Sequence, residues 1–283
     1  MKKSIKQTLP AILVLIGLAF ASCNSGKQES PKSDTKNDST TVQNKTDNSV
    51  DDAVTLKSSS DGILLRYNPK LDETVSIKTT IDQVITVLGQ KGTSNITMTM
   101  NMTATNKTDS LVTTQAQIKE MSVNSDVMGQ KISFDSKHME DVDPTIAGNF
   151  ISLIDKTFEI VYDIYGNPVI VPEEYPKEQG VTAVFPKEMV HEGSQWTRDT
   201  ESEISGMTAH SVATYTVKKI NEKTTEIELS GNITADMVMG DMSGTMIIDN
   251  ETGLPISATI EIPAKTTGDI PMTMNQTVTI TSE

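Results

Sequence analysis

The sequence predicts an all-β or β-rich α+β protein whose antiparallel sheet or sheets are curved, with a half-barrel as one form the curvature can take. From Ile96 to Met102, apolar residues alternate with Thr and Asn, which is the period of a strand with one buried face. Thr is frequent along the chain, and its branched side chain suits half-buried pleated surfaces. Short polar turns separate the alternating segments, as expected for hairpins.

Several other segments have the same alternation. Ser211–Val217 and Thr225–Leu229 flank a polar stretch at Asn221, which predicts a hairpin. A second hairpin turn is expected at Asn106–Asp109, and Met272–Ile280 is expected to form the last strand. Glycine and proline predict further turns at Gly166-Asn167-Pro168 and Thr252-Gly253.

The chain also indicates two related β halves, at about 62–176 and 177–283. Four landmarks recur in the same order at similar offsets, although Thr-rich strands with polar turns can look alike without duplication. The landmark pairs are Tyr67-Asn-Pro69 with Phe185-Pro186-Lys187, Asn106 with Asn221, Val127-Met128-Gly129 with Val238-Met239-Gly240, and Phe134-Asp135-Ser136 with Ile248-Asp249-Asn250.

One helix is expected inside an insertion in the first half. The motif at Gly166 resembles the motif at Gly253 at a shorter offset than the other pairs, which places extra residues between about Lys137 and Asp163. Within them, a helix is predicted at about 143–156. Asp143 suits an N-cap, Pro144 suits the first helical position, and apolar residues follow at helical spacing.

The first residues are typical of a secretory signal. Three lysines without an acid precede the apolar run Leu9–Phe20, which is too short to be a stable membrane span. Ala21-Ser22-Cys23 then resembles the lipobox of bacterial lipoproteins, with Phe20 in place of the commoner Leu. The resemblance implies a signal peptide at 1–22, removed before Cys23, and acyl chains such as palmitate on Cys23. Asn24, in place of Asp, favours the outer membrane.

Residues 23–60 are polar and poor in apolar side chains, so we expect a disordered tether between the lipid and a folded domain at 61–283. The formal net charge of −14 argues against a nucleic-acid partner, because such binding needs clustered cations. One cysteine and three scattered histidines give no metal-ligand spacing, and no catalytic or cofactor motif occurs. The sequence thus predicts no catalytic residue, metal site or cofactor.

The folded part resembles an uncharacterised family of Bacteroidetes envelope lipoproteins, which implies architecture and location rather than mechanism. The resembling segments are Leu65-Arg66-Tyr67, Ile96–Met102, Gly166-Asn167-Pro168, Gly193–Trp196 and Asp249–Pro255.

Methionine is the candidate site residue. Met98, Met100 and Met102 would share one face of a strand, where they could fill a core, line a face for an apolar ligand, or bind Cu(I) together with His210 or His138. Trp196, the single tryptophan, is either a core anchor or part of a binding surface.

We therefore expect an outer-membrane lipoprotein that faces the periplasm and reaches the membrane through its anchor. It would be a non-enzymatic binding or envelope-accessory module, for an apolar ligand or an envelope protein. The alternative is a Met-rich periplasmic copper-handling protein. A hydrolase would need a buried carboxylate pair, or a His–acid pair in a cleft.

Overall fold

The computed structural model describes residues 62–141, 151–172, 175, 183–204, 207–235, 238–266 and 271–283. The predicted signal peptide 1–22, the lipidation site Cys23 and the tether 23–60 lie outside the described residues. Within the part that is described, no helix combines the length and the hydropathy needed to cross a membrane.

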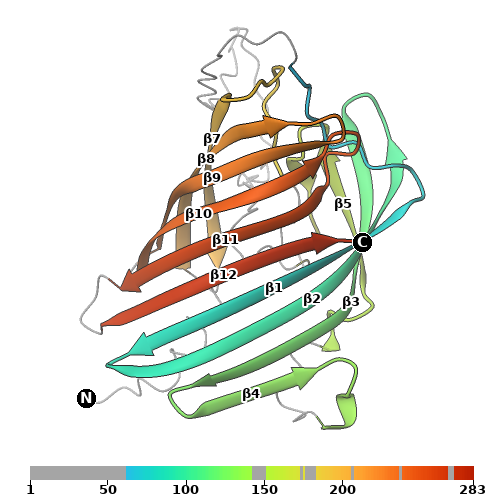
Figure 1. Cartoon of the computed structure of the whole chain (residues 1–283). Coiled ribbons are helices and arrows are strands. Elements are labelled where there is room, and N and C mark those ends of the chain that lie inside the picture. Colours follow the sequence, from blue (N-terminus) through green and yellow to red (C-terminus); the bar gives the residue numbers. More distant parts are fainter. Residues whose placement is uncertain are drawn as a thin grey trace, which may run out of the picture.

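The described chain forms one open antiparallel sheet of twelve strands, which confirms the all-β prediction (Figure 1). The strand order is β6-β5-β3-β2-β1-β12-β11-β10-β9-β8-β7, with β4 also paired to β3. The strands are β1 Thr74–Val87, β2 Gln90–Lys107, β3 Leu111–Val127, β4 Gln130–Asp135, β5 Thr157–Asp163, β6 Pro168–Ile170, β7 Gln195–Ile204, β8 Met207–Ile220, β9 Thr224–Ala235, β10 Val238–Asp249, β11 Pro255–Thr266 and β12 Met272–Ser282.

The first and last strands meet in the middle of the sheet. β1 pairs with β12 in an unbroken antiparallel register in which Ile81 lies opposite Val278. In Figure 1 the sheet is curved, so that β5 lies behind the front strands β12, β1 and β2. The sheet therefore has an inner and an outer face, as predicted for a curved sheet.

The two halves repeat one strand order. Starting from β1, neighbouring strands are β1, β2, β3, β5 and β6; starting from β7, they are β7, β8, β9, β10 and β11. β12 lies between β1 and β11 and joins the halves. The predicted boundary between the halves, at about residues 176 and 177, falls before β7.

The insertion in the first half splits one strand into two. β3 pairs with β4 along Ser122–Val127 and with β5 along Leu111–Gln117, so β4 and β5 together occupy the place that β10 holds beside β9. The residues between them include a short 3-10 turn at Met139–Asp141. The sequence predicted an insertion near this point, between about Lys137 and Asp163.

The predicted helix at 143–156 lies mainly outside the described residues, and its predicted end is wrong. The Asp155 N–H donates to the Ile118 carbonyl at 2.9 Å, and Ile154 forms an isolated bridge with Ile118. The physical reason is that the chain turns here to bond β3, and Asp155, with a φ of 59°, lies outside the helical region, so a helix cannot continue to residue 156.

Three of the four landmark pairs have equivalent places in the two halves. The turns after Asn106 and at Asn221 connect β2 to β3 and β8 to β9, as predicted. The third pair is not equivalent, because Met128-Gly129 forms the β3–β4 turn with positive φ, whereas Met239 and Gly240 lie within β10. Val127 ends β3 whereas Val238 begins β10, so the similar residues occupy different positions in the two halves.

The two turns at Gly166 and Gly253 share one construction. Asp163 Oδ1 accepts hydrogen bonds from the backbone N–H groups of Tyr165 and Asn167, at 2.9 and 2.8 Å. Asp249 Oδ1 accepts from the N–H groups of Glu251 and Thr252, at 3.1 and 2.8 Å. In each turn a glycine with positive φ follows, and a proline then begins the next strand. An aspartate thus fixes the turn in both halves.

Candidate functional site

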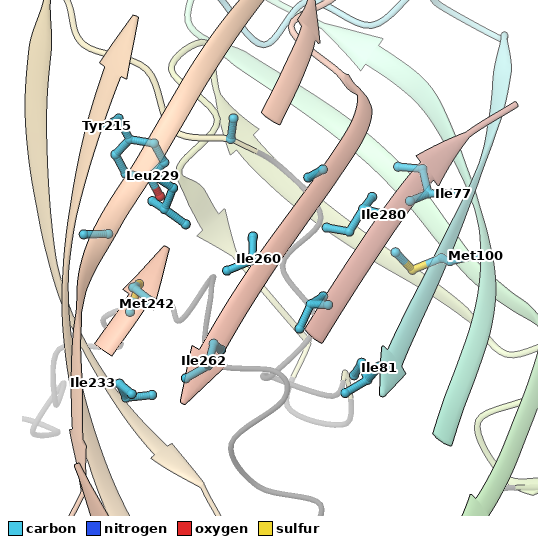
Figure 2. Packing of buried hydrophobic residues seen from close by; sticks show 14 of the residues in the cluster. Ile77, Ile81, Met100, Tyr215, Leu229, Ile233, Met242, Ile260, Ile262 and Ile280 are labelled. Carbon is cyan, nitrogen blue, oxygen red and sulfur yellow. The ribbon is translucent and has the colours of Figure 1, made fainter. Parts of the chain in front are cut away.

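The inner face of the sheet is the candidate site. In the long strands, alternate side chains point to this face and most of them are buried, while most of the residues between them are polar and more exposed. Figure 2 shows side chains from β1, β2, β8, β9, β10, β11 and β12 on this face. Those labelled are Ile77, Ile81, Met100, Tyr215, Leu229, Ile233, Met242, Ile260, Ile262 and Ile280, and all of them are buried.

All described strands belong to the one sheet, and Leu65, Tyr67, Phe185 and Val190 from the segments before β1 and β7 join its inner-face side chains in the apolar cluster. Sheets with one apolar face usually bury it against another layer. Here the inner-face side chains join a single apolar cluster that extends across the sheet. An apolar surface built from both halves is therefore gathered on one side of one sheet.

The residues before β1 (62–73) and before β7 (183–194) lie at one end of the inner face, and we call them the lead-in segments. The N–H and carbonyl of Ile63 bond the carbonyl and N–H of Val190, each at 2.8 Å. The Arg66 guanidinium donates to the carbonyl oxygens of Pro186 and Lys187, at 3.0 and 2.6 Å. The two segments that the sequence matched as repeat landmarks thus lie side by side.

Aromatic residues gather at this end, which we call the aromatic end. The rings of Tyr67 and Tyr162 have centroids 4.9 Å apart, and Phe158 meets Tyr175 edge to face at 5.2 Å. The Tyr67 hydroxyl shares a hydrogen bond of 3.1 Å with the Thr114 hydroxyl. Burial raises the pKa of Tyr67 to about 12, although that hydrogen bond opposes the shift. The phenol therefore stays neutral at ordinary pH.

The three candidate methionines lie together on the inner face of β2. Met98, Met100 and Met102 are 5%, 1% and 4% exposed. The Tyr175 hydroxyl donates to Met100 Sδ at 3.6 Å, which links this row to the aromatic end. Their burial agrees with the core and apolar-ligand interpretations, because both need the side chains to face inward.

Trp196 lies at the start of β7, and six strands separate β7 from β2 in the sheet order. Its indole stacks on Tyr215, and Nε1 donates to the Val184 carbonyl at 3.0 Å. It is 4% exposed, so it anchors the last strand of the sheet, and the sheet order does not bring it beside the methionines.

The histidines do not join the methionines. His210 lies on the outer face of β8, where Nε2 is 2.6 Å from Asp199 Oδ1. His138 is exposed beyond β4, with Nδ1 3.0 Å from Asp135 Oδ2. This hydrogen bond lowers the pKa of Asp135. The mixed Met–His copper site is therefore not assembled, and no cluster of three His, Cys, Asp or Glu side chains suited to a metal occurs in the described ranges.

A short polar row that sequence reasoning missed crosses the inner face at the junction of the halves. Gln83 on β1 lies opposite Gln276 on β12 and Ser94 on β2, and all three are buried. Gln83 Nε2 donates to Gln276 Oε1 at 2.8 Å. Strand alternation could have found them, because each glutamine occupies an inward position between apolar residues.

Two polar atoms on β1 are buried without a hydrogen-bond partner, Gln83 Oε1 and Thr79 Oγ1. Leaving such an atom unsatisfied costs about 1–3 kcal/mol. The buried polar side chains of the described core are all uncharged: Thr79, Gln83, Ser94, Thr114, Ser194, Ser211, Thr225 and Gln276. Around Gln83 and Thr79, the inward residues of β1, β2 and β12 are all uncharged, so this part of the inner face has hydrogen-bonding capacity without charge.

The sequence matches one family model. A family of unknown function, DUF6263, matches residues 178–255. That range lies within the second half and covers less than half of the chain. The expectation of an uncharacterised family is supported at this level, and the lipoprotein and Bacteroidetes assignments stay predictions. No curated protein matches the sequence.

Among solved structures, the fold is similar to one described as "Lipid-protein interactions in lipovitellin". The TM-score is 0.51 and the sequence identity 8%. The match covers 76% of this chain and 25% of that chain, so this protein spans about a quarter of its length. At this identity the likeness is one of fold.

Proposed function

We propose that this protein is a lipid-anchored envelope lipoprotein whose curved sheet holds an apolar, lipid-like ligand on its inner face. The observation that carries the proposal is the inner face itself, which forms one buried apolar cluster across both halves of a single curved sheet. A ligand among these buried side chains would be held by apolar contacts, which an acyl chain supplies.

The methionine row supports the same function. Met side chains are unbranched and polarisable, so they adapt to ligands of variable shape. Met98, Met100 and Met102 are buried on the inner face, and Met100 accepts a hydrogen bond from Tyr175. Met242, Met272 and Met274 are buried on other strands. The fold match is to a protein described by its lipid interactions, and that description adds weight to a lipid-like ligand here.

The proposed setting is the periplasmic side of the outer membrane, to which Cys23 would attach the chain through acyl groups. Each buried methylene contributes about 0.8 kcal/mol to such an anchor, so several chains hold a protein stably. In this setting the domain acts as a non-enzymatic binding or accessory module, with membrane lipid close by as the source of ligand.

Photolabelling tests the proposal. The full chain, in membranes, is exposed to a fatty acid that carries a photoactivatable diazirine in its tail, and the labelled residues are mapped by mass spectrometry. We expect label on inward residues such as Met100 and Met274, and much less on their outward neighbours Thr99 and Thr273. Equal labelling of inward and outward neighbours, or no labelling of β2 and β12, would overturn the proposal.

A further inference from the structure

The polar row at the junction of the halves indicates what kind of ligand the inner face takes. Gln83 and Gln276 are each 2% exposed and lie opposite one another on β1 and β12. Their neighbours along the strands are apolar: Ile81 and Ile85 on β1, and Met274 and Val278 on β12. A bonded amide pair therefore interrupts an otherwise aliphatic stretch.

The hydrogen bonds of Gln83 are incomplete. Its Nε2 donates to Gln276 Oε1, but its own Oε1 accepts nothing. Thr79 Oγ1, two inward positions nearer the aromatic end, also has no partner. Thr79 and Gln83 lie four residues, about 13 Å, apart along the strand, so a single polar group of a ligand can supply the missing hydrogen bond of Gln83 Oε1 but not that of Thr79 Oγ1 as well.

The charge of the surroundings restricts that group. The inward residues of β1 and of its neighbours β2 and β12 are all uncharged, so a carboxylate, phosphate or ammonium beside Gln83 would meet no counter-ion there. A hydroxyl fits, since it donates one hydrogen bond to Gln83 Oε1 and brings no charge.

We propose that Gln83, held by Gln276, binds the uncharged hydroxyl end of a long-chain lipid whose tail lies along the aliphatic and methionine rows of the inner face. The inference rests on the proposed function and deepens it, because it names the ligand class as neutral hydroxylated lipids, such as fatty alcohols and monoacylglycerols. From Gln83 to Ile77 the strand extends about 20 Å, which accommodates a long alkyl tail.

The test compares two photoactivatable probes of one chain length, a fatty alcohol and its methyl ether, on the full chain in membranes. The ether has the same tail but no hydrogen to donate. We expect half-maximal labelling of β1 and β12 at an alcohol concentration about tenfold lower than for the ether, the ratio typical of one buried hydrogen bond. In the double variant Gln83→Leu/Gln276→Leu, both probes should label at the ether's concentration.

The double variant removes both partners of the amide pair, so it should fold and melt at a temperature no lower than the native chain. Gln115→Leu is the matched control, because Gln115 is an exposed glutamine on the outer face of β3. It should keep the tenfold preference for the alcohol.

The labelling results distinguish hydroxyl binding at Gln83 from binding of any apolar ligand on the inner face. Equal labelling of the native inner face by alcohol and ether would overturn the hydroxyl inference and leave the apolar-ligand function standing. A preference that survives in the double variant would also overturn it, because the hydroxyl would then bind elsewhere. No labelling of the inner face by either probe would overturn both.

Discussion

The indole of Trp196 stacks on the phenol ring of Tyr215, with ring centroids 5.3 Å apart and an angle of 6° between the planes. The two residues are directly opposite in the register of β7 and β8. β7 is the last strand at its end of the sheet, so it has a strand neighbour on one side only. The stack therefore holds an edge strand that would otherwise depend on one hydrogen-bond ladder.

Trp196→Ala should lower the free energy of unfolding by about 3–5 kcal/mol, because it removes a large buried side chain and leaves a cavity. Urea unfolding of the full chain, followed by circular dichroism, measures the loss. Val169→Ala is the control, since Val169 is 56% exposed on β6 and its loss should change stability by less than about 0.5 kcal/mol. A Trp196 variant no less stable than that control would contradict the anchoring role.

Alkaline pH should lower the free energy of unfolding through the buried Tyr67 at the aromatic end. The pKa of Tyr67 is raised by burial from 10.0 to about 12, so the unfolded chain loses its phenolic proton before the folded chain does. The stabilisation that Tyr67 provides is therefore complete below pH 10 and is lost as pH rises towards 12, a decline of about 2–3 kcal/mol.

Urea unfolding from pH 9 to 12 measures that decline. Burial raises the pKa of Tyr215 as well, so Tyr67→Phe should flatten the decline only in part. An identical pH dependence in the native chain and in Tyr67→Phe would show that the Tyr67 phenol ionises equally in both states.

The turn at Gly253 should be far less tolerant of substitution than the turn at Gly89. Both glycines have positive φ, but a Cβ at Gly253 would lie 2.0 Å from the Arg66 carbonyl oxygen, whereas a Cβ at Gly89 would meet nothing within 4 Å. Gly89→Ala should cost about 1 kcal/mol through its backbone conformation alone. Gly253→Ala should cost more than about 2 kcal/mol, because the lead-in segment must also move away.

Melting temperatures of the two variants provide the comparison. If Gly253→Ala is no worse than Gly89→Ala, then the contact between the lead-in segment and the β10–β11 turn does not constrain the fold.

Local patterns predicted much of the fold because strand alternation and turn chemistry are local properties. Ile96–Met102 alternates over seven residues, and the structure extends that strand to Gln90–Lys107. The ends of long strands escaped prediction because residues such as Asn95 and Thr105 can lie in strands or in turns. The pairing of β1 with β12 could not be predicted, since nothing local indicates that the first strand meets the last.

Part of the candidate site was predictable because strand alternation is a local property of the sequence. Alternation placed Met98, Met100 and Met102 on one face, and the structure has all three on the inner face. Alternation could have placed Gln83 and Gln276 on the inner face, but it could not have shown that they pair with each other. Their meaning depends on a contact across 193 residues of sequence.

The predicted anchor gives a decisive test at Cys23. The chain has one cysteine, so Cys23→Ser removes every thiol and every S-linked acyl group at once. Metabolic labelling with an alkynyl palmitate should mark the native chain, and Cys23→Ser should be unlabelled and keep its leader, because the lipoprotein peptidase cuts before a lipidated cysteine. An ordinary secretory signal would give the opposite pattern: neither chain labelled, and both shortened and released from the membrane. If Cys23→Ser loses its label but its folded part still melts as the native chain does, then the lipid acts as a tether and the sheet is stable without it.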